Sequence, residues 1–269
     1  MSGRLLGEIG TIEWCRRTGG ILGRGERARF TAAVALTTTR VLPRLLAARA
    51  GRGRGGDSAG PDPSALTPPD SAFARDVVAA CADLDPMLVE HGYRSYLYAR
   101  ALGAVDGLTC DDEALFAATM LHDFGFKDMD TLSGKCFTLA GAQAAEPLLA
   151  ASPLSAELQH AVLDAITLHF NPVVPARRGA LQHLVHDGII LDVLGSRAWH
   201  LDGAGVRRVQ ERHPRHGFLV RGEPMLREHA RRVPGCRVAA MFACGFGPAL
   251  RTSPWRAAER RAAAAAPAT

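Results

Sequence analysis

The sequence predicts an all-α fold, and two observations carry this prediction. Apolar residues recur at three- and four-residue spacing in the segments between residues 70 and 250, as in amphipathic helices. Residues 85–103 show this pattern clearly, with Leu88, Tyr98 and Leu102 on one face. No segment alternates apolar and polar residues as a half-buried strand does. We therefore expect a single helical core.

Capping signals predict where the helices begin and end. Thr109 and Asp112 have the spacing of a capping box, and the helix that they open is expected to run through Asp123 and to end at Gly125. Ser155 is expected to open the next long helix. The remaining helical segments expected between residues 140 and 250 are 141–151, 180–194 (closed by Gly195), 203–213, 223–232 and 236–245.

Changes in composition divide the chain into four parts. The first part has apolar residues at roughly helical spacing and is expected to pack against the main domain rather than to form an amphipathic surface helix. The second part is rich in Gly, Pro, Asp and Ser, as in a flexible linker. The last part is almost all Ala and Arg, as in a frayed helix or a disordered tail. In chain order they are a helical N-terminal extension (1–50), a Gly/Pro-rich linker (51–69), the helical domain that carries the chemistry (70–255) and an Ala/Arg-rich tail (256–269).

The composition is that of a globular protein and excludes several classes of function. Of the 269 residues 47% are hydrophobic, but no uninterrupted apolar run is long enough for a transmembrane helix. The six cysteines form no C-x-x-C pair, which favours free thiols in a reducing cytoplasm. The net charge of +5 comes from Arg-rich segments that lack interleaved aromatic residues, so nucleic acid is disfavoured as a partner. A small-molecule substrate is expected instead, and a homo-oligomer is compatible with the sequence.

Three of the ten histidines, His91, His122 and His169, lie inside apolar helical segments. Each alone is compatible with a hydrogen-bonded imidazole in the core. Asp123 follows His122 at the end of an apolar run, where burying a carboxylate is costly unless it is paired or binds a cation. Because Gly125 ends the helix close by, the adjacent His and Asp can both reach one ion. The group therefore indicates a metal site with further ligands from other helices.

The order and spacing of these residues resemble the HD-domain superfamily of metal-dependent hydrolases. Its signature is an early His, an adjacent His-Asp pair and a later Asp, which His91, His122, Asp123 and Asp192 match. Over residues 69–255 the chain is similar to the cyanamide-hydratase-like branch, and the resemblance implies an HD-domain helical bundle. The words that carry it are HGYRSYLYA (91–99), LHDFG (121–125), GA (141–142), ITLH (166–169), LVHDGIILDVLG (184–195) and HPRHGF (213–218).

Two aspartates compete for the last position of this signature. Asp187 and Asp192 are five positions apart, so on a helix they project about 140° from each other and cannot both face one ion. Periodicity alone leaves the choice open, because apolar residues flank both. The resemblance selects Asp192, and Asp187 is then a polar residue outside the ligand set.

Departures from the pattern of the superfamily narrow the chemistry. Nucleotide-cleaving members often have Lys directly after the His-Asp-x-Gly word, where this chain has Phe126 and only then Lys127. Dinuclear members typically have a His shortly before the Gly-Ala pair, and the segment 136–141 contains none. One divalent ion, Zn²⁺ or Fe²⁺, is therefore expected. Thr138 stands where the branch commonly has Glu, which leaves the substrate open.

The resemblance implies a metal-dependent hydrolase or hydratase. The ion would lower the pKa of its water towards about 7 and polarise a small electrophile such as a nitrile or an amide. Asp123 or His169 would move the proton. The four metal ligands that the resemblance implies are His91, His122, Asp123 and Asp192.

Two alternatives remain at this point. One is an HD phosphohydrolase that acts on a nucleotide or a phosphoester, with Arg94 or Arg100 in place of the missing Lys. The other is a non-catalytic HD domain that binds a ligand. The presence of all four residues of the signature favours an enzyme over the second alternative.

Overall fold

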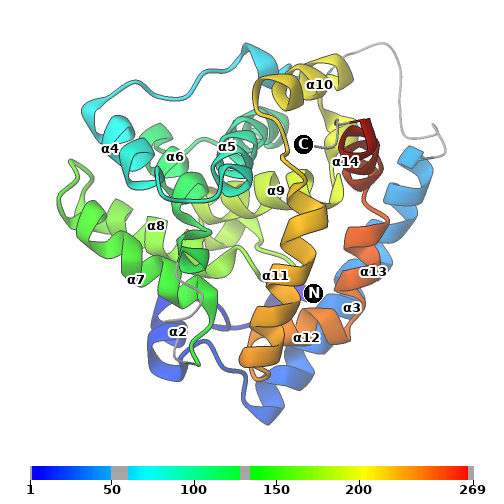
Figure 1. The fold of residues 1–269 in the computed structure, drawn as a ribbon. Helices are drawn as coiled ribbons and strands as arrows, with labels where there is room; N and C mark the ends of the chain where they lie inside the picture. Colours follow the sequence, from blue (N-terminus) through cyan, green and yellow to red (C-terminus); the bar gives the residue numbers. More distant parts are fainter. Residues whose placement is uncertain (1, 50–59, 128–133, 266–269) are drawn as a thin grey trace.

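The computed structural model describes residues 2–49, 60–127 and 134–265, and within them it contains helices and no β-strand (Figure 1). The all-α prediction is confirmed. The α-helices are α1 (Ser2–Leu5), α2 (Ile12–Thr18), α3 (Arg24–Arg49), α4 (Ala72–Ala80), α5 (Pro86–Asp106), α6 (Asp112–Leu121), α7 (Phe137–Ala150), α8 (Ala156–Leu168), α9 (Ala180–Leu194), α10 (Gly203–Arg212), α11 (Phe218–Arg232), α12 (Arg237–Ala243), α13 (Phe246–Arg251) and α14 (Pro254–Ala265). Short 3-10 helices are η1 (Pro63–Ala65), η2 (Phe124–Phe126), η4 (Ala176–Arg178) and η5 (Ala198–His200).

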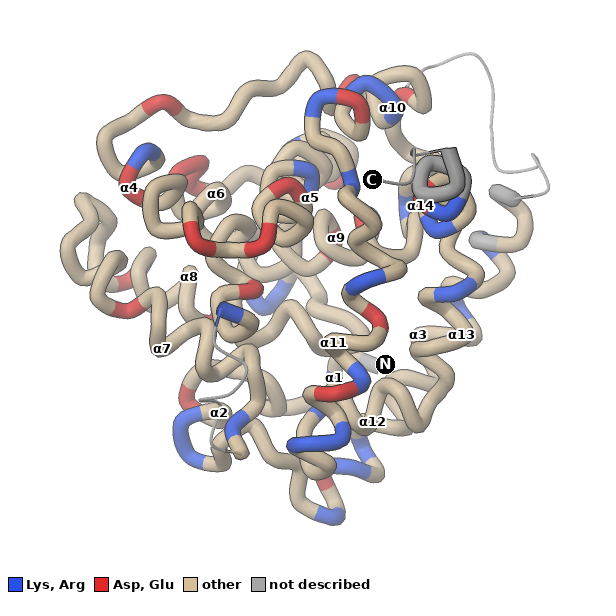
Figure 2. The backbone as a smooth tube through the Cα atoms, viewed as in Figure 1, with Lys and Arg blue, Asp and Glu red and all other residues tan. Residues whose placement is uncertain are grey.

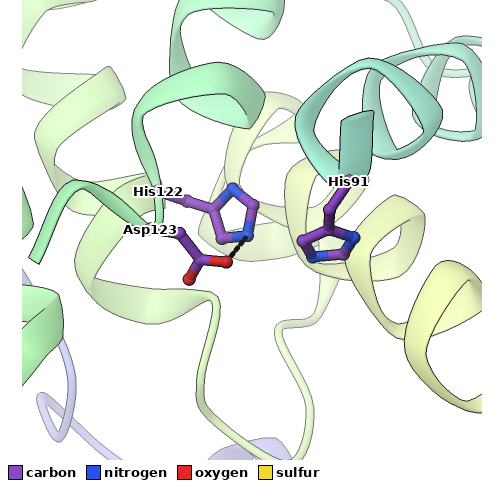
Figure 3. A group of neighbouring side chains, drawn as sticks. All are labelled: His91, His122 and Asp123. Carbon is purple, nitrogen blue, oxygen red and sulfur yellow. Dashed lines mark ion pairs between the residues drawn. The ribbon is translucent and has the colours of Figure 1, made fainter. Parts of the chain in front are cut away.

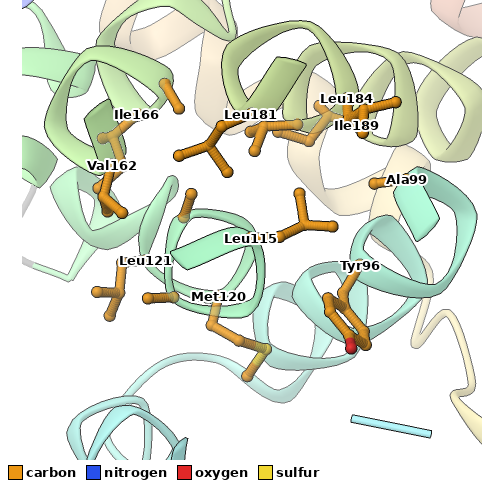
Figure 4. Close-up of a cluster of buried hydrophobic side chains, with 14 of the residues drawn as sticks. Tyr96, Ala99, Leu115, Met120, Leu121, Val162, Ile166, Leu181, Leu184 and Ile189 are labelled. Carbon is orange, nitrogen blue, oxygen red and sulfur yellow. The ribbon is translucent and has the colours of Figure 1, made fainter. Parts of the chain in front are cut away.

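The centre of the molecule is formed by α5, α6, α8 and α9, which pack against one another. Apolar side chains from all four helices meet between them, and Figure 4 shows Tyr96 of α5, Leu115 of α6, Ile166 of α8 and Leu184 of α9 in this core. Aliphatic residues dominate it, as the low aromatic content of 6% requires. The burial of this apolar surface is the main stabilising contribution to the fold.

Two glycines bring α5 close to its neighbours. A Cβ atom at Gly188 of α9 would lie 2.3 Å from the carbonyl oxygen of Ser95, and one at Gly92 of α5 would lie 2.9 Å from the sulfur of Met120. Any larger residue would therefore push the helices apart. Because Gly92 is next to His91, the close crossing of α5 and α6 also decides which residues that histidine can reach.

The helix boundaries correct two details of the sequence prediction. Asp111, not Thr109, caps α6, because its carboxylate accepts the amide of Ala114 at 2.8 Å. Gly125 does not cap this helix in a left-handed conformation. It permits a close approach instead, since a Cβ there would lie 1.9 Å from the carbonyl oxygen of Phe137 at the start of α7. The predicted caps Ser155 and Gly195 are confirmed.

The N-terminal part shares the core of the domain that follows it. Ile12, Trp14 and Phe30 are fully buried and belong to the same hydrophobic cluster as the central helices. Helix α2 contacts α7 and α8, and α3 contacts α12. Residues 51–59 of the predicted linker lie outside the described residues, whereas the part from residue 60 contains η1, which packs against α10.

The start of the predicted tail is an integral part of the fold, contrary to the expectation of a frayed or disordered end. Arg256 and Glu259 on α14 are 8% and 5% exposed. Glu259 accepts hydrogen bonds from Arg215 at 2.7 Å and from the amides of Leu219 and Val220 at the beginning of α11. The Ala/Arg-rich composition gives no sign of these contacts, because only two side chains of the segment, Arg256 and Glu259, make them.

Charged residues cover the outer helices in both signs (Figure 2). Arginines of the segment 207–232 are engaged in ion pairs, as the contacts of Arg208 with Asp62 and of Arg231 with Glu228 show. Such pairing is ordinary on a solvated surface. In the part of the chain that the structure describes, no helix combines the length and the apolar character needed to cross a membrane.

Candidate metal centre

Three of the four predicted metal ligands converge at the ends of two central helices. His91 extends from α5, and His122 and Asp123 directly follow the last residue of α6 (Figure 3). One ligand atom from each of the three lies within 4.8 Å of the others. All three residues are buried, with 1%, 1% and 7% exposure. Two imidazoles and a carboxylate at this spacing form a donor set suited to Zn²⁺ or Fe²⁺.

His122 presents a free lone pair to this group. Its Nδ1–H donates to the carbonyl oxygen of Thr119 at 2.7 Å, which leaves Nε2 unprotonated in the neutral ring. Nε2 lies 3.3 Å from the Asp123 carboxylate and, within the described residues, has no hydrogen-bond partner although it is buried. A buried nitrogen without a partner is costly in a fold that has no use for it. A nitrogen that is buried and makes no hydrogen bond is available to bind a metal ion.

The end of α6 explains how adjacent residues reach the same point. The helix ends at Leu121, and Asp123 has left the helical conformation with φ −99° and ψ 10°. Burial raises the pKa of Asp123, but the protonated His122 ring 3.3 Å away outweighs burial and holds the pKa of Asp123 below its usual range, while the carboxylate raises the pKa of His122. The carboxylate is therefore ionised and able to bind a cation. A cation at this point would replace the Nε2 proton of His122.

Asp192, the fourth predicted ligand, lies beside His91 and outside the converging group. Its carboxylate accepts the Nδ1–H of His91 at 2.6 Å. It also accepts two hydrogen bonds from Arg94, at 2.8 and 2.9 Å, and one from Arg215 at 2.6 Å. Burial raises the pKa of Asp192, but the two guanidinium groups outweigh burial and hold the pKa well below its usual range.

These contacts define what Asp192 does in the structure. The hydrogen bond fixes the His91 ring and uses its Nδ1, so Nε2 is the nitrogen left to bind an ion. Burial lowers the pKa of His91 to about 4 despite the neighbouring carboxylate, so the ring is neutral at pH 7. That Asp192 also binds the metal directly stays a prediction.

His169 lies against His122 on the other side. Its Nδ1–H donates to the carbonyl oxygen of Ile166 at 2.6 Å, and the two imidazole rings are 4.8 Å apart at an edge-on angle. Burial and the neighbouring His122 lower the pKa of His169 well below its usual value. His186, which forms a second His-Asp pair in the sequence, donates to the carbonyl oxygen of His169 at 3.0 Å and so fixes its backbone.

A cavity opens on these residues. It contains about 660 Å³ of empty space, counting the part open to solvent. His91, His122, Asp123 and His169 line one part of it, and apolar residues line most of the rest. Among the latter are Phe137, Phe170, Ile189, Phe218, Leu226 and Met241.

The sequence interpretation missed the residues that hold this site in place. Phe218 stacks on the His91 ring with 4.1 Å between ring centroids, and Arg215 binds both Asp192 and Glu259. Both belong to the word HPRHGF, which contributed to the resemblance without any role being assigned to its residues. That word was the one available signal, since Glu259 lies in a low-complexity segment.

A second group of His and Asp residues lies at the other end of α5. One ligand atom each from Asp106, His183 and Asp187 also lies within 4.8 Å of the others. Arg197 binds both carboxylates, with hydrogen bonds of 2.6 Å to each. Asp187 therefore points away from Asp192, in agreement with the angle predicted from helix geometry.

No protein-family model matches the chain, and no curated protein shows significant similarity to it.

Proposed function

We propose that this protein is a metal-dependent hydrolase or hydratase of the HD-domain superfamily, with one divalent ion, Zn²⁺ or Fe²⁺, bound by His91, His122 and Asp123. The observation that carries the proposal is the buried, unpartnered Nε2 of His122 beside a second imidazole and an ionised carboxylate. The reaction is the addition of water to a small electrophile such as a nitrile or an amide. The motif likeness to the cyanamide-hydratase-like branch supports this choice of substrates.

A divalent ion in this position would supply Lewis acidity towards the electrophile and a lowered pKa for a water ligand. The protein prepares the ligand atoms for it. The Thr119 carbonyl oxygen fixes the His122 ring and Asp192 fixes the His91 ring, each through Nδ1–H. The two arginines neutralise Asp192, whereas the Asp123 carboxylate faces the rings of His122, His91 and His169.

His169 is placed to handle a proton of the reaction. Its Nδ1–H is committed to the Ile166 carbonyl oxygen, so Nε2 carries a lone pair that can accept a hydrogen bond from water or substrate. The apolar wall of the cavity limits water around it and thereby strengthens every electrostatic interaction there. We assign proton transfer to His169 and Asp123.

The phosphohydrolase alternative loses support from the basic residues near the site. Within the described residues no Lys or Arg lines the cavity. Arg94 is fully buried and binds Asp192 and two backbone carbonyls, and Arg100 binds Asp112. Lys127 points to Asp83 at the surface. A phosphate in the cavity would therefore lack the cationic partners that phosphoryl transfer needs.

A site for one ion is also consistent with the segment 136–141, which contains no His where dinuclear members of the superfamily have one. Cys136 lies 3.3 Å from the hydroxyl of Thr138 and belongs to a separate hydrophobic cluster with Cys236. Thr138 in turn accepts a hydrogen bond from Arg237 at 2.8 Å and does not line the cavity.

The test is turnover by the full chain loaded with Zn²⁺ or Fe²⁺, measured as hydration of cyanamide and alkyl nitriles and as phosphate release from nucleotides. We expect hydration without phosphate release. In His169→Gln, kcat should fall about 100-fold or more while the metal content is unchanged. Phosphate release without hydration would establish the phosphohydrolase instead, and a metal-free protein without turnover would establish the binding module.

A further inference from the structure

We propose that the substrate carries an uncharged, apolar body, an aryl or medium-length alkyl group, next to its reacting group. This inference rests on the proposed function for the reacting group and on the cavity wall for the body.

The wall beyond the metal centre is apolar. Phe137 and Phe170 come from the α7 and α8 side, Ile189 from α9, and Met241 from α12, so four separate elements supply hydrocarbon surface to one space. Each methylene group buried against such a surface favours binding by about three- to fourfold. An alkyl or aryl group attached to a nitrile or an amide would therefore contribute most of the affinity.

The two polar residues that line the cavity away from the metal centre, Asn171 and Glu223, are already engaged in hydrogen bonds within the protein. Asn171 donates to the carbonyl oxygen of Ile9 and accepts from Arg237, each at 2.8 Å. Glu223 is bound by three arginines of α11, α13 and α14. A charged or strongly hydrated substrate body would lose its water here without replacement, which is unfavourable.

One glycine marks open space in this wall. Gly222 of α11 lies one turn after Phe218, which stacks on His91, and the two residues face the same cavity. Gly222 is buried and helical, and a Cβ atom added to it would meet no heavy atom within 4 Å. A side chain at position 222 would thus occupy space that the cavity leaves free for a ligand, without displacing the backbone.

This arrangement gives a direct test. Binding of acetonitrile, butyronitrile, hexanenitrile and benzonitrile is measured by calorimetry on the full chain, both metal-free and loaded with Zn²⁺. We expect affinity to rise about three- to fourfold per added methylene group in both forms. Phenyl phosphate should bind at least tenfold more weakly than benzonitrile.

Gly222→Phe should weaken hexanenitrile and benzonitrile at least tenfold and leave acetonitrile binding and metal content unchanged. Gly222→Leu is a smaller filling of the same space for the case that the Phe variant does not fold. The matched control is Gly25→Phe, a helical, exposed glycine of α3 that also has no neighbour within 4 Å of an added Cβ. It should bind every nitrile like the wild type.

A flat affinity series, or unchanged binding of the long nitriles in both Gly222 variants, would overturn the inference. Its failure can be told apart from failure of the proposed function. Hydration of cyanamide without any preference for long nitriles would leave the function standing and remove the inference. If long nitriles bind in a way that depends on Gly222 but the metal-loaded protein does not turn them over, the inference stands and the proposed function fails.

Discussion

Two groups of histidine and aspartate side chains lie near the two ends of α5. They differ in whether an arginine binds their carboxylates. At one end His91, His122 and Asp123 are buried, and among the described residues no Arg or Lys forms an ion pair with Asp123. At the other end, Arg197 binds the carboxylates of both aspartates in its group, and the side chains remain partly exposed. Spacing alone does not distinguish the two groups.

From this comparison we expect that arginine decides which acidic cluster can take a cation. A carboxylate that already accepts two guanidinium hydrogen bonds has little to gain from an ion, whereas a buried carboxylate beside histidines and without a guanidinium has more to gain. Asp192 obeys the same rule, since Arg94 and Arg215 bind it. It therefore resembles the aspartates of the second group more than Asp123.

The largest expected effect is on the free energy of unfolding, and it separates two aspartates of α9: Asp192, which lies beside the first group, and Asp187, which belongs to the second. Asp192→Ala removes the carboxylate shared by two buried guanidinium groups and leaves Arg94 with backbone carbonyls and no carboxylate, so the free energy of unfolding should fall by about 3–5 kcal/mol. Asp187→Ala releases Arg197 at a partly exposed site and should cost less than about 1 kcal/mol. Urea unfolding of both variants measures this, and equal losses would contradict the comparison.

A smaller effect is expected on metal affinity. Asp192→Asn keeps an acceptor for the His91 ring but removes the charge, and loss of such a supporting contact typically weakens metal binding about 10- to 100-fold. Competition with a chelator on the folded variant gives the value. A loss as large as that of Asp123→Ala would show instead that Asp192 is itself a ligand.

If Arg197 is removed, the second group should become able to bind a cation, as we propose for the first group. Arg197→Ala frees the carboxylates of Asp106 and Asp187 beside His183, and a second, weak Zn²⁺ site should then appear in a titration. Arg75→Ala, which breaks an exposed pair with Asp70 elsewhere, is the control and should add no site. If Arg197→Ala adds none either, compensation by arginine is not what separates the groups.

The smallest effect is a pH dependence at the second group. The hydrogen bond from Arg197 lowers the pKa of Asp106, so the carboxylate stabilises the fold above its ordinary pKa and this contribution is lost as the pH falls through the lowered value. Asp106→Asn should therefore destabilise the protein by less than about 1 kcal/mol at pH 7, and by still less at pH 3. A difference that grows towards acid pH would contradict this sign.

The sequence was sufficient to predict the all-α fold class, several of the central helices and the residues that converge at the centre of the site. Helical periodicity identifies α5 and α9, and His122 with Asp123 is conspicuous because a polar pair ends an apolar run. The binding of two arginines to the Asp192 carboxylate was not predictable from the sequence. Arg94 and Arg215 are separated from Asp192 by 98 and 23 residues, and nothing local distinguishes them from arginines at the surface.

The boundaries of the folded unit were harder to predict for the same reason. Trp14 and Phe30 lie in a segment that contains Pro43 and precedes a Gly-rich stretch, so composition separates them from the core that they join. Glu259 is one acidic residue in an Ala/Arg-rich end, and its role depends on the free amides at the start of α11. Contacts between distant segments decide both cases.

The most direct test is the metal content of the full chain purified without added metal and then exposed to Zn²⁺ or Fe²⁺. We predict about one ion per chain in the wild type, its loss in His122→Ala, and its retention in the matched variant His183→Ala. Circular dichroism checks that both variants are folded. Retention of the ion in folded His122→Ala, or its loss in His183→Ala, would contradict the assignment of the metal centre.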